Sequence, residues 1–150
     1  LDVGCGSGYY SLIIKKAGAN PFGIDISKEM IYNLNKNKIQ GTVGNIENIK
    51  LSKKFDKVLC AGILEFVKGL DNALKGVKIH LKKGGKVIIL YPRKSLGGYL
   101  YKIFHLFHGI KIKLFSEKEI KRSLNKYDFK ILESRKSNII TTCIKAVLIR

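Results

Sequence analysis

Apolar and polar positions along the chain follow two periods, and their alternation predicts a repeating order of strands and helices. A strand is predicted at 40–44, and the runs rich in apolar residues at 1–3, 21–25, 57–61 and 86–91 are also typical of strands. The last run is continuously apolar, as in a strand that is buried on both faces. Amphipathic segments with helical spacing separate the runs. This order favours an α/β fold with a mostly parallel sheet.

Local signals place the first two helices. The segment 9–17 has helical spacing, and Gly18 follows it as a C-terminal stop. Ser27 predicts an N-cap for the second helix, because its hydroxyl can accept a hydrogen bond from a free backbone N–H group. Glu29 then lies in the first turn, where the helix dipole favours a negative charge.

The later elements are predicted in the same way. We expect Asp71 to cap a third helix that ends at Gly84-Gly85, with an apolar face of Leu74, Val77 and Leu81. Two more helices are expected at 96–108 and 117–126. Two final strands, 129–133 and 141–149, are expected to pair antiparallel through a turn near Ser137-Asn138.

Length and composition indicate one globular domain. The chain has 150 residues, of which 45% are hydrophobic and 27% charged. No apolar run approaches the ~18 residues that a membrane-spanning helix needs, and no secretory signal pattern is visible. Residue 1 is Leu rather than Met and lies within a predicted strand. We therefore expect residues 1–150 to form one domain whose start is missing.

The charge balance is strongly basic. Lys and Arg number 29 against 11 Asp and Glu, which gives a net charge of +18. Such a field attracts anions such as nucleic acid, phospholipid headgroups or acidic substrates. The lysines are spread along the whole chain, so a bias of the overall composition is an equally open explanation.

The cysteines argue against a metal centre. Cys5, Cys60 and Cys143 are widely separated and form no Cys-x-x-Cys pair. We expect no metal site, and we interpret the three side chains as small buried groups in a reducing, cytoplasmic compartment.

The most informative motif lies at the start of the chain. The sequence Leu-Asp-Val-Gly-Cys-Gly-Ser-Gly, residues 1–8, joins the first strand to the first helix. Glycines at alternate positions allow a sharp turn and a close approach of the backbone to a ligand, and the helix that follows offers free N–H groups to an anion. Tyr9 stands where a dinucleotide fingerprint has its last glycine, so that fingerprint is broken.

The pattern Asp-x-Gly-x-Gly-x-Gly resembles motif I of the class I S-adenosylmethionine-dependent methyltransferases. The turn at 81–87, Leu-Lys-Lys-Gly-Gly-Lys-Val, is similar to the turn before strand five in that family. The resemblance covers residues 1–92 and, more loosely, the last two strands. It implies a Rossmann-like three-layer α/β sandwich, with a mostly parallel seven-stranded sheet and an antiparallel last strand.

Acidic and amide residues follow the second and third predicted strands. Asp25 ends the second strand, about 20 residues after the glycine motif, where a carboxylate can accept both hydroxyls of a ribose. A helix-capping role for Asp25 is the alternative. By resemblance, Asn45 contacts the adenine amino group and Ile46 packs on its ring, although the family more often has Asp at that place. Asn45 could instead be a turn residue.

The resemblance also implies a complete set of binding residues for S-adenosylmethionine. Asp2 and the glycine loop are expected to hold the methionine portion, and the residues that follow the next strands hold the nucleoside. The implied set is Asp2, Gly4, Cys5, Gly6, Gly8, Tyr9, Asp25, Ile26, Asn45, Ile46 and Ala61.

The sequence does not identify the catalytic base. The sequence Leu-Glu-Phe-Val at 64–67 is similar to a Leu-Glu-His-Val motif of small-molecule members, but Phe66 replaces the histidine. An acid–base role of that histidine therefore does not carry over. His105 and His108 are the candidates that remain, because histidine exchanges protons near neutral pH. The alternative, which is the commoner situation for a histidine, is a surface position without a catalytic role.

The predicted helix 96–108 admits three interpretations. Its apolar stripe is fringed by lysines and the two histidines. It could pack on the sheet, cover the substrate site as a lid, or lie on a membrane surface, in which case 96–113 would form a peripheral membrane contact. The stripe consists of Leu96, Tyr99, Leu100, Ile103, Phe104 and Phe107.

These observations favour a methyltransferase that acts on a small-molecule substrate, with a quinone-like or lipid-like acceptor as the working hypothesis. A dehydrogenase is the nearest enzyme alternative, and the broken fingerprint argues against it. An RNA methyltransferase stays open because of the charge, although the Asn-Pro-Pro and Pro-Cys motifs of base-methylating enzymes are absent. A non-catalytic binding domain is the third alternative. The sequence indicates no oligomeric state.

Overall fold

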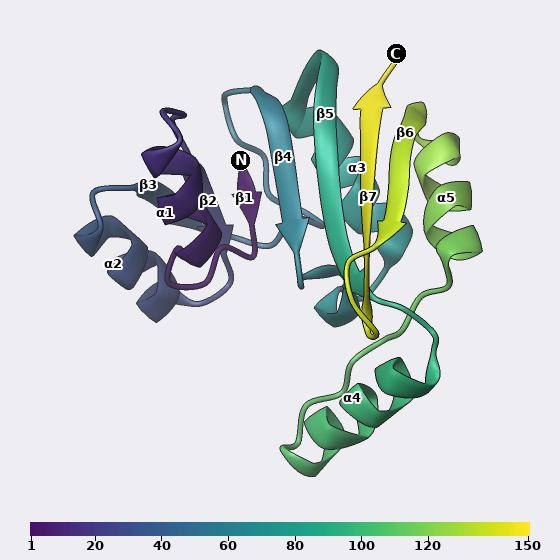
Figure 1. Ribbon diagram of the computed structural model, residues 1–150. Helices are drawn as coiled ribbons and strands as arrows, with labels where there is room; N and C mark the ends of the chain where they lie inside the picture. Colours follow the sequence, from purple (N-terminus) through teal and green to yellow (C-terminus); the bar gives the residue numbers. More distant parts are fainter.

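The computed structural model describes residues 1–150 and contains one seven-stranded sheet with helices on both faces (Figure 1). The strands are β1 (Asp2–Val3), β2 (Phe22–Asp25), β3 (Gln40–Val43), β4 (Phe55–Ala61), β5 (Leu81–Pro92), β6 (Phe129–Lys136) and β7 (Thr141–Leu148). The helices are α1 (Tyr9–Lys16), α2 (Lys28–Lys36), the short 3₁₀ helix η1 (Leu64–Phe66), α3 (Leu70–His80), α4 (Leu96–Phe107) and α5 (Glu117–Lys126).

The order of the strands in the sheet is β3-β2-β1-β4-β5-β7-β6. The first five strands of this order pair parallel, whereas β7 lies antiparallel to β5 and β6 antiparallel to β7. The predicted hairpin of the last two strands is confirmed. The predicted sheet of seven mostly parallel strands is confirmed as well. The carboxyl ends of β1 to β5 therefore meet at one edge of the sheet, where open α/β sheets bind ligands.

Neighbouring residues of β2 show how the sheet is covered on both faces. Gly23 faces α2, so closely that a Cβ atom there would lie 2.5 Å from Leu34 and 2.6 Å from the Cys5 sulfur. Ile24 faces the other way, into the larger core beneath α3 and α5. Because successive strand residues point to opposite faces, the two apolar clusters lie on opposite sides of the sheet.

Two helix starts follow the expected capping chemistry. The Ser27 hydroxyl accepts a hydrogen bond from the N–H group of Met30 at 3.3 Å, as predicted for the start of α2. Ser116 and Glu119 form a reciprocal capping box at the start of α5.

The prediction for the third helix was wrong at both ends. Asp71 lies inside the first turn of α3 and bonds to Ser123 and Lys126 of α5 instead of capping its own helix. The helix also ends at His80 rather than at Gly84-Gly85, because Leu81 already pairs with Phe55 at the start of β5. The periodicity of the apolar residues runs on through Leu81 and does not reveal where helix becomes strand.

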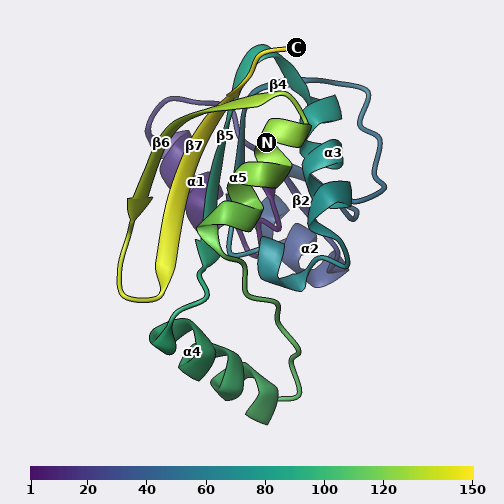
Figure 2. The ribbon, with the colours of Figure 1, turned by 90° about the vertical axis from the view of Figure 1, so that its right-hand side faces the viewer.

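Helix α4 extends away from the sheet rather than packing on it (Figures 1 and 2). The chain leaves and returns through a narrow neck, in which Arg93 forms a parallel bridge with Phe115. All six residues of the predicted apolar stripe are exposed, from 50% at Ile103 to 86% at Phe107. The interpretation as a helix packed on the sheet is therefore wrong. None of the helices combines the length and the hydropathy that crossing a bilayer requires.

We predict that Gly76→Ala destabilises the protein although alanine is the better helix former. Gly76 lies in the middle of α3, and a Cβ atom there would lie 1.9 Å from the carbonyl oxygen of Ile46. Helix propensity alone would add about 1 kcal/mol of stability, whereas forced displacement of packed backbone costs typically about 1–3 kcal/mol or more. We expect a net loss, measured as a lower urea midpoint.

The matched control is Gly69→Ala at the start of the same helix, where the nearest atom to a new Cβ lies at an ordinary 3.5 Å. A Gly76→Ala protein that is as stable as the wild type would contradict the packing argument.

Candidate functional site

The loop between β1 and α1 turns sharply at the carboxyl edge of the sheet. Gly4, Gly6 and Gly8 all adopt positive φ values, of 67°, 53° and 99°, which other residues rarely tolerate. The carbonyl oxygen of Ile24 accepts the N–H groups of Gly4 and Cys5 at 2.8 and 3.1 Å, which fixes the loop against β2. The loop therefore depends on glycine for its backbone conformation.

The carboxylate of Asp25 connects the glycine loop with the end of β2. Its Oδ2 accepts the N–H of Gly6 and its Oδ1 the N–H of Ser27, each at 2.9 Å. Each carboxylate oxygen has two lone-pair positions, so both oxygens can still accept a further donor. The side chain is half-buried and lines a cleft beside the loop.

That cleft brings together most of the residues predicted to bind the nucleoside. Ile26 is 72% exposed beside Asp25, and Ile46 is buried at the wall. Asn45 also lines the cleft; its Oδ1 accepts the N–H of Glu47 at 2.9 Å, while its amide nitrogen has no partner in the protein. The full lining is Val3, Gly4, Ile24, Asp25, Ile26, Gly44, Asn45, Ile46, Glu47, Ile63, Phe66 and Val67.

Glu47 was missed by the sequence reasoning. Its two carboxylate oxygens accept the N–H groups of Lys68 and Gly69 at 3.0 and 2.9 Å. A carboxylate at this position satisfies free N–H groups at the start of α3 and favours the helix dipole. The contact joins the loop after β3 to the loop after β4 across the cleft. No local motif signals it, because its partners are more than twenty residues away.

Asp2 lies beneath the cleft and does not line it. Its side chain is 2% exposed and accepts a hydrogen bond from the Ser11 hydroxyl at 2.6 Å. Burial raises the pKa of Asp2, and the bond from Ser11 partly opposes that rise. The first N–H groups of α1, those of Tyr9 and Tyr10, donate to no group in the protein. Asp2 therefore fixes the first turn of α1 through Ser11, while the N–H groups of Tyr9 and Tyr10 remain free to bind a ligand.

The other predicted residues are dispersed. Cys5 is buried, and burial raises the pKa of its thiol to about 12. Tyr9 is 69% exposed. His105 of α4 packs edge-on against Tyr101 and Phe66, with ring centroids 4.4 and 6.3 Å apart, so it lies near the site. His108 is bonded to the Phe104 carbonyl at the outer end of the helix. No group of three His, Cys, Asp or Glu side chains comes together.

A second cavity, of about 340 Å³, lies on the other side of the loop that follows β4. It is lined by Ala61 at the end of β4, by Gly62 and Glu65 from the loop that follows, by the end of β5, by Tyr10 and Tyr101, and by the 137–141 turn. Glu65 is only 3% exposed, its Oε2 has no hydrogen-bond partner, and burial raises its pKa to about 7. Buried polar atoms are normally paired, so this carboxylate is unusual.

Comparison with known proteins identifies relatives of the chain. A family model described as a methyltransferase domain matches residues 1–89. A ubiquinone biosynthesis O-methyltransferase from Pelagibacter ubique is 38% identical over 109 residues, which make up 69% of this chain and 45% of that protein. Its namesake from Coxiella burnetii is 32% identical over 111 residues, 69% of this chain and 47% of that protein. The chain thus spans about half the length of these relatives.

Solved structures share the fold. The magnesium protoporphyrin IX methyltransferase of Synechocystis, solved with bound S-adenosylhomocysteine, superposes with a TM-score of 0.81 at 23% identity, covering 97% of this chain and 72% of that one. An S-adenosylmethionine-dependent methyltransferase from Methanosarcina mazei gives the same TM-score and identity and covers 97% of this chain and 90% of that one. At this identity the likeness establishes the architecture alone.

We predict that Glu65→Gln stabilises the protein at alkaline pH and not at acidic pH. Because the folded protein raises the pKa of Glu65 from 4.5 to about 7, it binds a proton that the unfolded chain releases. The stability of the wild type should therefore fall as the pH rises from about 4.5 through 7, by roughly 3 kcal/mol. Glutamine cannot ionise and escapes this loss.

Urea unfolding of both proteins at about pH 5 and pH 8.5 measures the effect. If the stability difference between the two proteins is the same at both pH values, folding does not raise the pKa of Glu65 and the prediction is wrong.

Proposed function

The chain belongs to the class I S-adenosylmethionine-dependent methyltransferases, and we propose that it transfers a methyl group from S-adenosylmethionine to a small-molecule acceptor. The observation that carries the proposal is the joining of the glycine loop to the carboxylate of Asp25 beside the cleft. This arrangement presents backbone N–H groups and a carboxylate with free lone pairs at the edge where open α/β sheets bind nucleosides.

The residues of the cleft fit the nucleoside part of the cofactor. Asp25 would accept hydrogen bonds from the two ribose hydroxyls, since each of its oxygens has only one donor in the protein. Ile26 and Ile46 offer apolar surface to the adenine ring. Asn45 would meet the ring's polar edge with the free lone pair of its Oδ1 and its unpartnered amide nitrogen.

The start of α1 fits the amino-acid part. The free N–H groups of Tyr9 and Tyr10 would receive the carboxylate, as helix N-termini receive anions. Asp2 would support this end from beneath, because its bond to Ser11 fixes the first turn of the helix. The bound sulfonium supplies an already activated methyl group. The protein therefore mainly has to hold donor and acceptor in line, which can contribute several kcal/mol.

The acceptor is proposed to be quinone-like or lipid-like. Relatives at 38% and 32% identity are named ubiquinone biosynthesis O-methyltransferases, and the second cavity has aromatic and apolar walls that suit a flat, poorly soluble ring.

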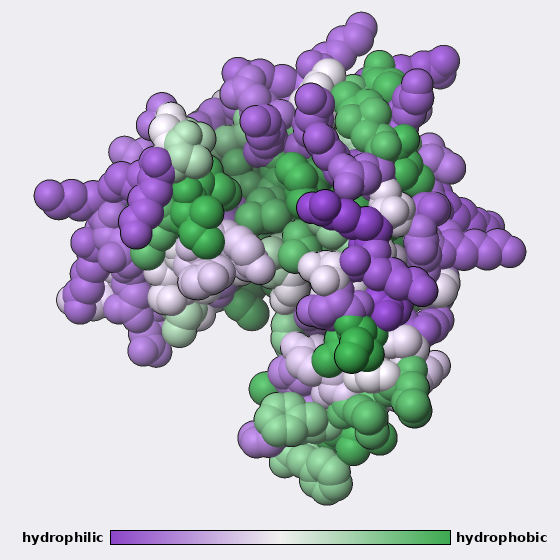
Figure 3. Space-filling model, in the orientation of Figure 1, coloured by the Kyte–Doolittle hydropathy of each residue, from purple (hydrophilic) through white to green (hydrophobic).

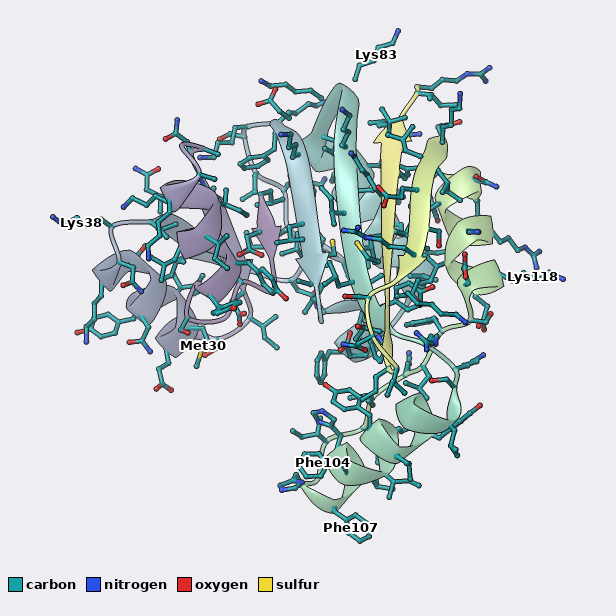
Figure 4. The ribbon with its side chains drawn as sticks, viewed as in Figure 1. Met30, Lys38, Lys83, Phe104, Phe107 and Lys118 are labelled. Carbon is teal, nitrogen blue, oxygen red and sulfur yellow. The ribbon has the colours of Figure 1, made fainter.

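An acceptor of this kind resides in lipid, and α4 supplies a surface for reaching it. Figure 3 shows apolar side chains gathered on α4, and Figure 4 shows Phe104 and Phe107 at its outer end, far from the sheet. No Asp or Glu occurs between residues 72 and 116, whereas Lys94, Lys102 and Lys111 lie on or beside the helix. Apolar side chains fringed by cations are typical of helices that lie on anionic membranes. We propose a peripheral membrane contact through 96–113.

We predict that Asp25→Ala weakens binding of S-adenosylhomocysteine at least tenfold, measured by isothermal titration. The variant removes charge-assisted hydrogen bonds to the ribose, worth about 1.5–3 kcal/mol each, and releases the N–H groups of Gly6 and Ser27. Asp56→Ala, an exposed acid at the far end of β4, is the control and should bind normally. Binding of NAD but not of S-adenosylhomocysteine by the wild type would favour a dehydrogenase instead.

We also predict that the protein sediments with vesicles containing phosphatidylglycerol and not with pure phosphatidylcholine vesicles. Replacing Phe104 and Phe107 together by glutamate should lower the vesicle affinity more than tenfold, because burial of one such ring contributes about 1.5–3 kcal/mol. Tyr32→Glu, on the exposed face of α2, is the control. Unchanged sedimentation of the double variant would exclude α4 as the contact.

A further inference from the structure

The second cavity is formed at the carboxyl ends of β4 and β5, and separate parts of the chain close it. Arg93 holds its outer wall, because the guanidinium donates to the carbonyl oxygens of Asn138, Ile139 and Thr141. Tyr101 of α4 and Tyr10 of α1 complete the walls. The walls of the cavity are therefore fixed by hydrogen bonds and by residues from several elements of the fold.

Glu65 is the only acidic residue that lines this cavity. Its backbone is fixed on both sides: it lies in η1, and its carbonyl oxygen accepts the N–H of Lys113 at 2.9 Å. Gly62, at a φ of 70°, turns the chain so that Glu65 is brought back beneath the loop, with Oε1 close to Gly62. An unpaired buried carboxylate costs stability, so a partner from outside the protein is the physical explanation that the geometry favours.

The two hollows share one wall. Ile63, Phe66 and Val67 line the nucleoside cleft, while Gly62 and Glu65 from the same segment line the second cavity. Tyr10 of the second cavity belongs to the open first turn of α1, where the amino-acid part of the cofactor is proposed to bind. A molecule in the second cavity would thus lie next to the methyl-donating end of a cofactor in the first.

We propose that Glu65 is the proton acceptor for a hydroxyl group on an aromatic ring bound in the second cavity. The inference rests on the proposed function and deepens it. As the new C–O bond forms, the C–S bond breaks and its electron pair stays on sulfur as a neutral thioether. The hydroxyl proton passes to the Glu65 carboxylate, which becomes a neutral carboxylic acid and later releases the proton to water.

The surroundings suit this role. The other titratable groups that face the cavity are Tyr10, Tyr91 and Tyr101, and burial raises the pKa of Tyr91, to about 12, and of Tyr101. The raised pKa values keep the phenols of Tyr91 and Tyr101 neutral in the physiological range, so these two groups do not compete for the proton. The nearby cations are occupied elsewhere: Arg93 by three carbonyl groups and the Lys113 ammonium by the carbonyl oxygen of Lys68.

His105 is the competing base, since it packs on Tyr101 at the mouth of the cavity. The positions of Glu65 and His105 relative to the cavity favour Glu65 as the base. Glu65 is 3% exposed, whereas His105 is only half-buried and does not line the cavity. A carboxyl group with a pKa of about 7 is also matched to proton transfer near neutral pH.

Methyl transfer from labelled S-adenosylmethionine to 4-methylcatechol tests the role of Glu65. In the wild type kcat/KM should rise with pH through about 7. Glu65→Gln should lower kcat/KM at least a hundredfold and abolish that rise, while its affinity for S-adenosylhomocysteine stays within about twofold of the wild type because Glu65 lies outside the nucleoside cleft. Glu133→Gln, an exposed acid on β6, is the matched control.

A spectroscopic measurement removes the dependence on turnover. The probe is 4-nitrocatechol, whose ionised form absorbs visible light, added to protein saturated with S-adenosylhomocysteine. A carboxylate at Glu65 disfavours a second negative charge beside it, so the bound probe should ionise at higher pH in the wild type than in Glu65→Gln.

The outcomes separate the two proposals. Failure of the wild type to bind S-adenosylhomocysteine overturns the proposed function. Normal cofactor binding combined with identical probe ionisation in wild type and Glu65→Gln, or with no spectral change on adding the probe, overturns the assignment of Glu65. Loss of the pH-dependent rise in His105→Gln, with Glu65→Gln unaffected, would transfer the role to His105.

Discussion

The structure depends on one constraint, namely that the chain must reverse direction within five residues at the end of β1. Three glycines with positive φ make this reversal, and the Gly6 N–H bonded to Asp25 holds it against β2. The same contact fixes a carboxylate and leaves the first N–H groups of α1 unpaired in the protein. The backbone groups that shape this turn are therefore also the groups that are available to bind a ligand. Glycine is required at position 4 for a second reason, because a Cβ atom there would lie 2.7 Å from the side chain of Ile63.

The sequence predicted the part of the fold that local chemistry determines. Alternating strand and helix periods, the Ser27 cap and the turn before the last strand all act over a few residues, and each was found where expected. The end of α3 was misjudged because Leu81 continues the apolar period of a helix while it pairs with Phe55 in the sheet. The pairing of Leu81 with a distant strand determines where α3 ends, and a local sequence pattern carries no information about such long-range pairing.

The site shows the same division. Asp25 and Asn45 could be found because Asp25 ends β2 and Asn45 lies just after β3, and parallel strands place their carboxyl ends together. Glu47 could not, since its partners belong to the loop after another strand. The burial of Glu65 was equally hidden: it requires the turn at Gly62 and the returning neck of α4. For α4 itself, a stripe of apolar residues specifies a helix with one apolar face but not what covers that face.

Asp25 and Glu65 both carry a carboxyl group, but their different surroundings suit the two groups to different roles. Two backbone N–H groups donate to Asp25 at a half-buried position and fix its carboxylate in place, which suits an acceptor for sugar hydroxyls. Glu65 is buried without a hydrogen-bond partner on Oε2, so its charge is disfavoured and its pKa approaches neutrality, which suits a group that gains and loses a proton. Carboxyl groups that lie in different environments commonly perform different tasks. Here the loop after β4 separates them: the cleft of Asp25 lies on one side of this wall and the cavity of Glu65 on the other.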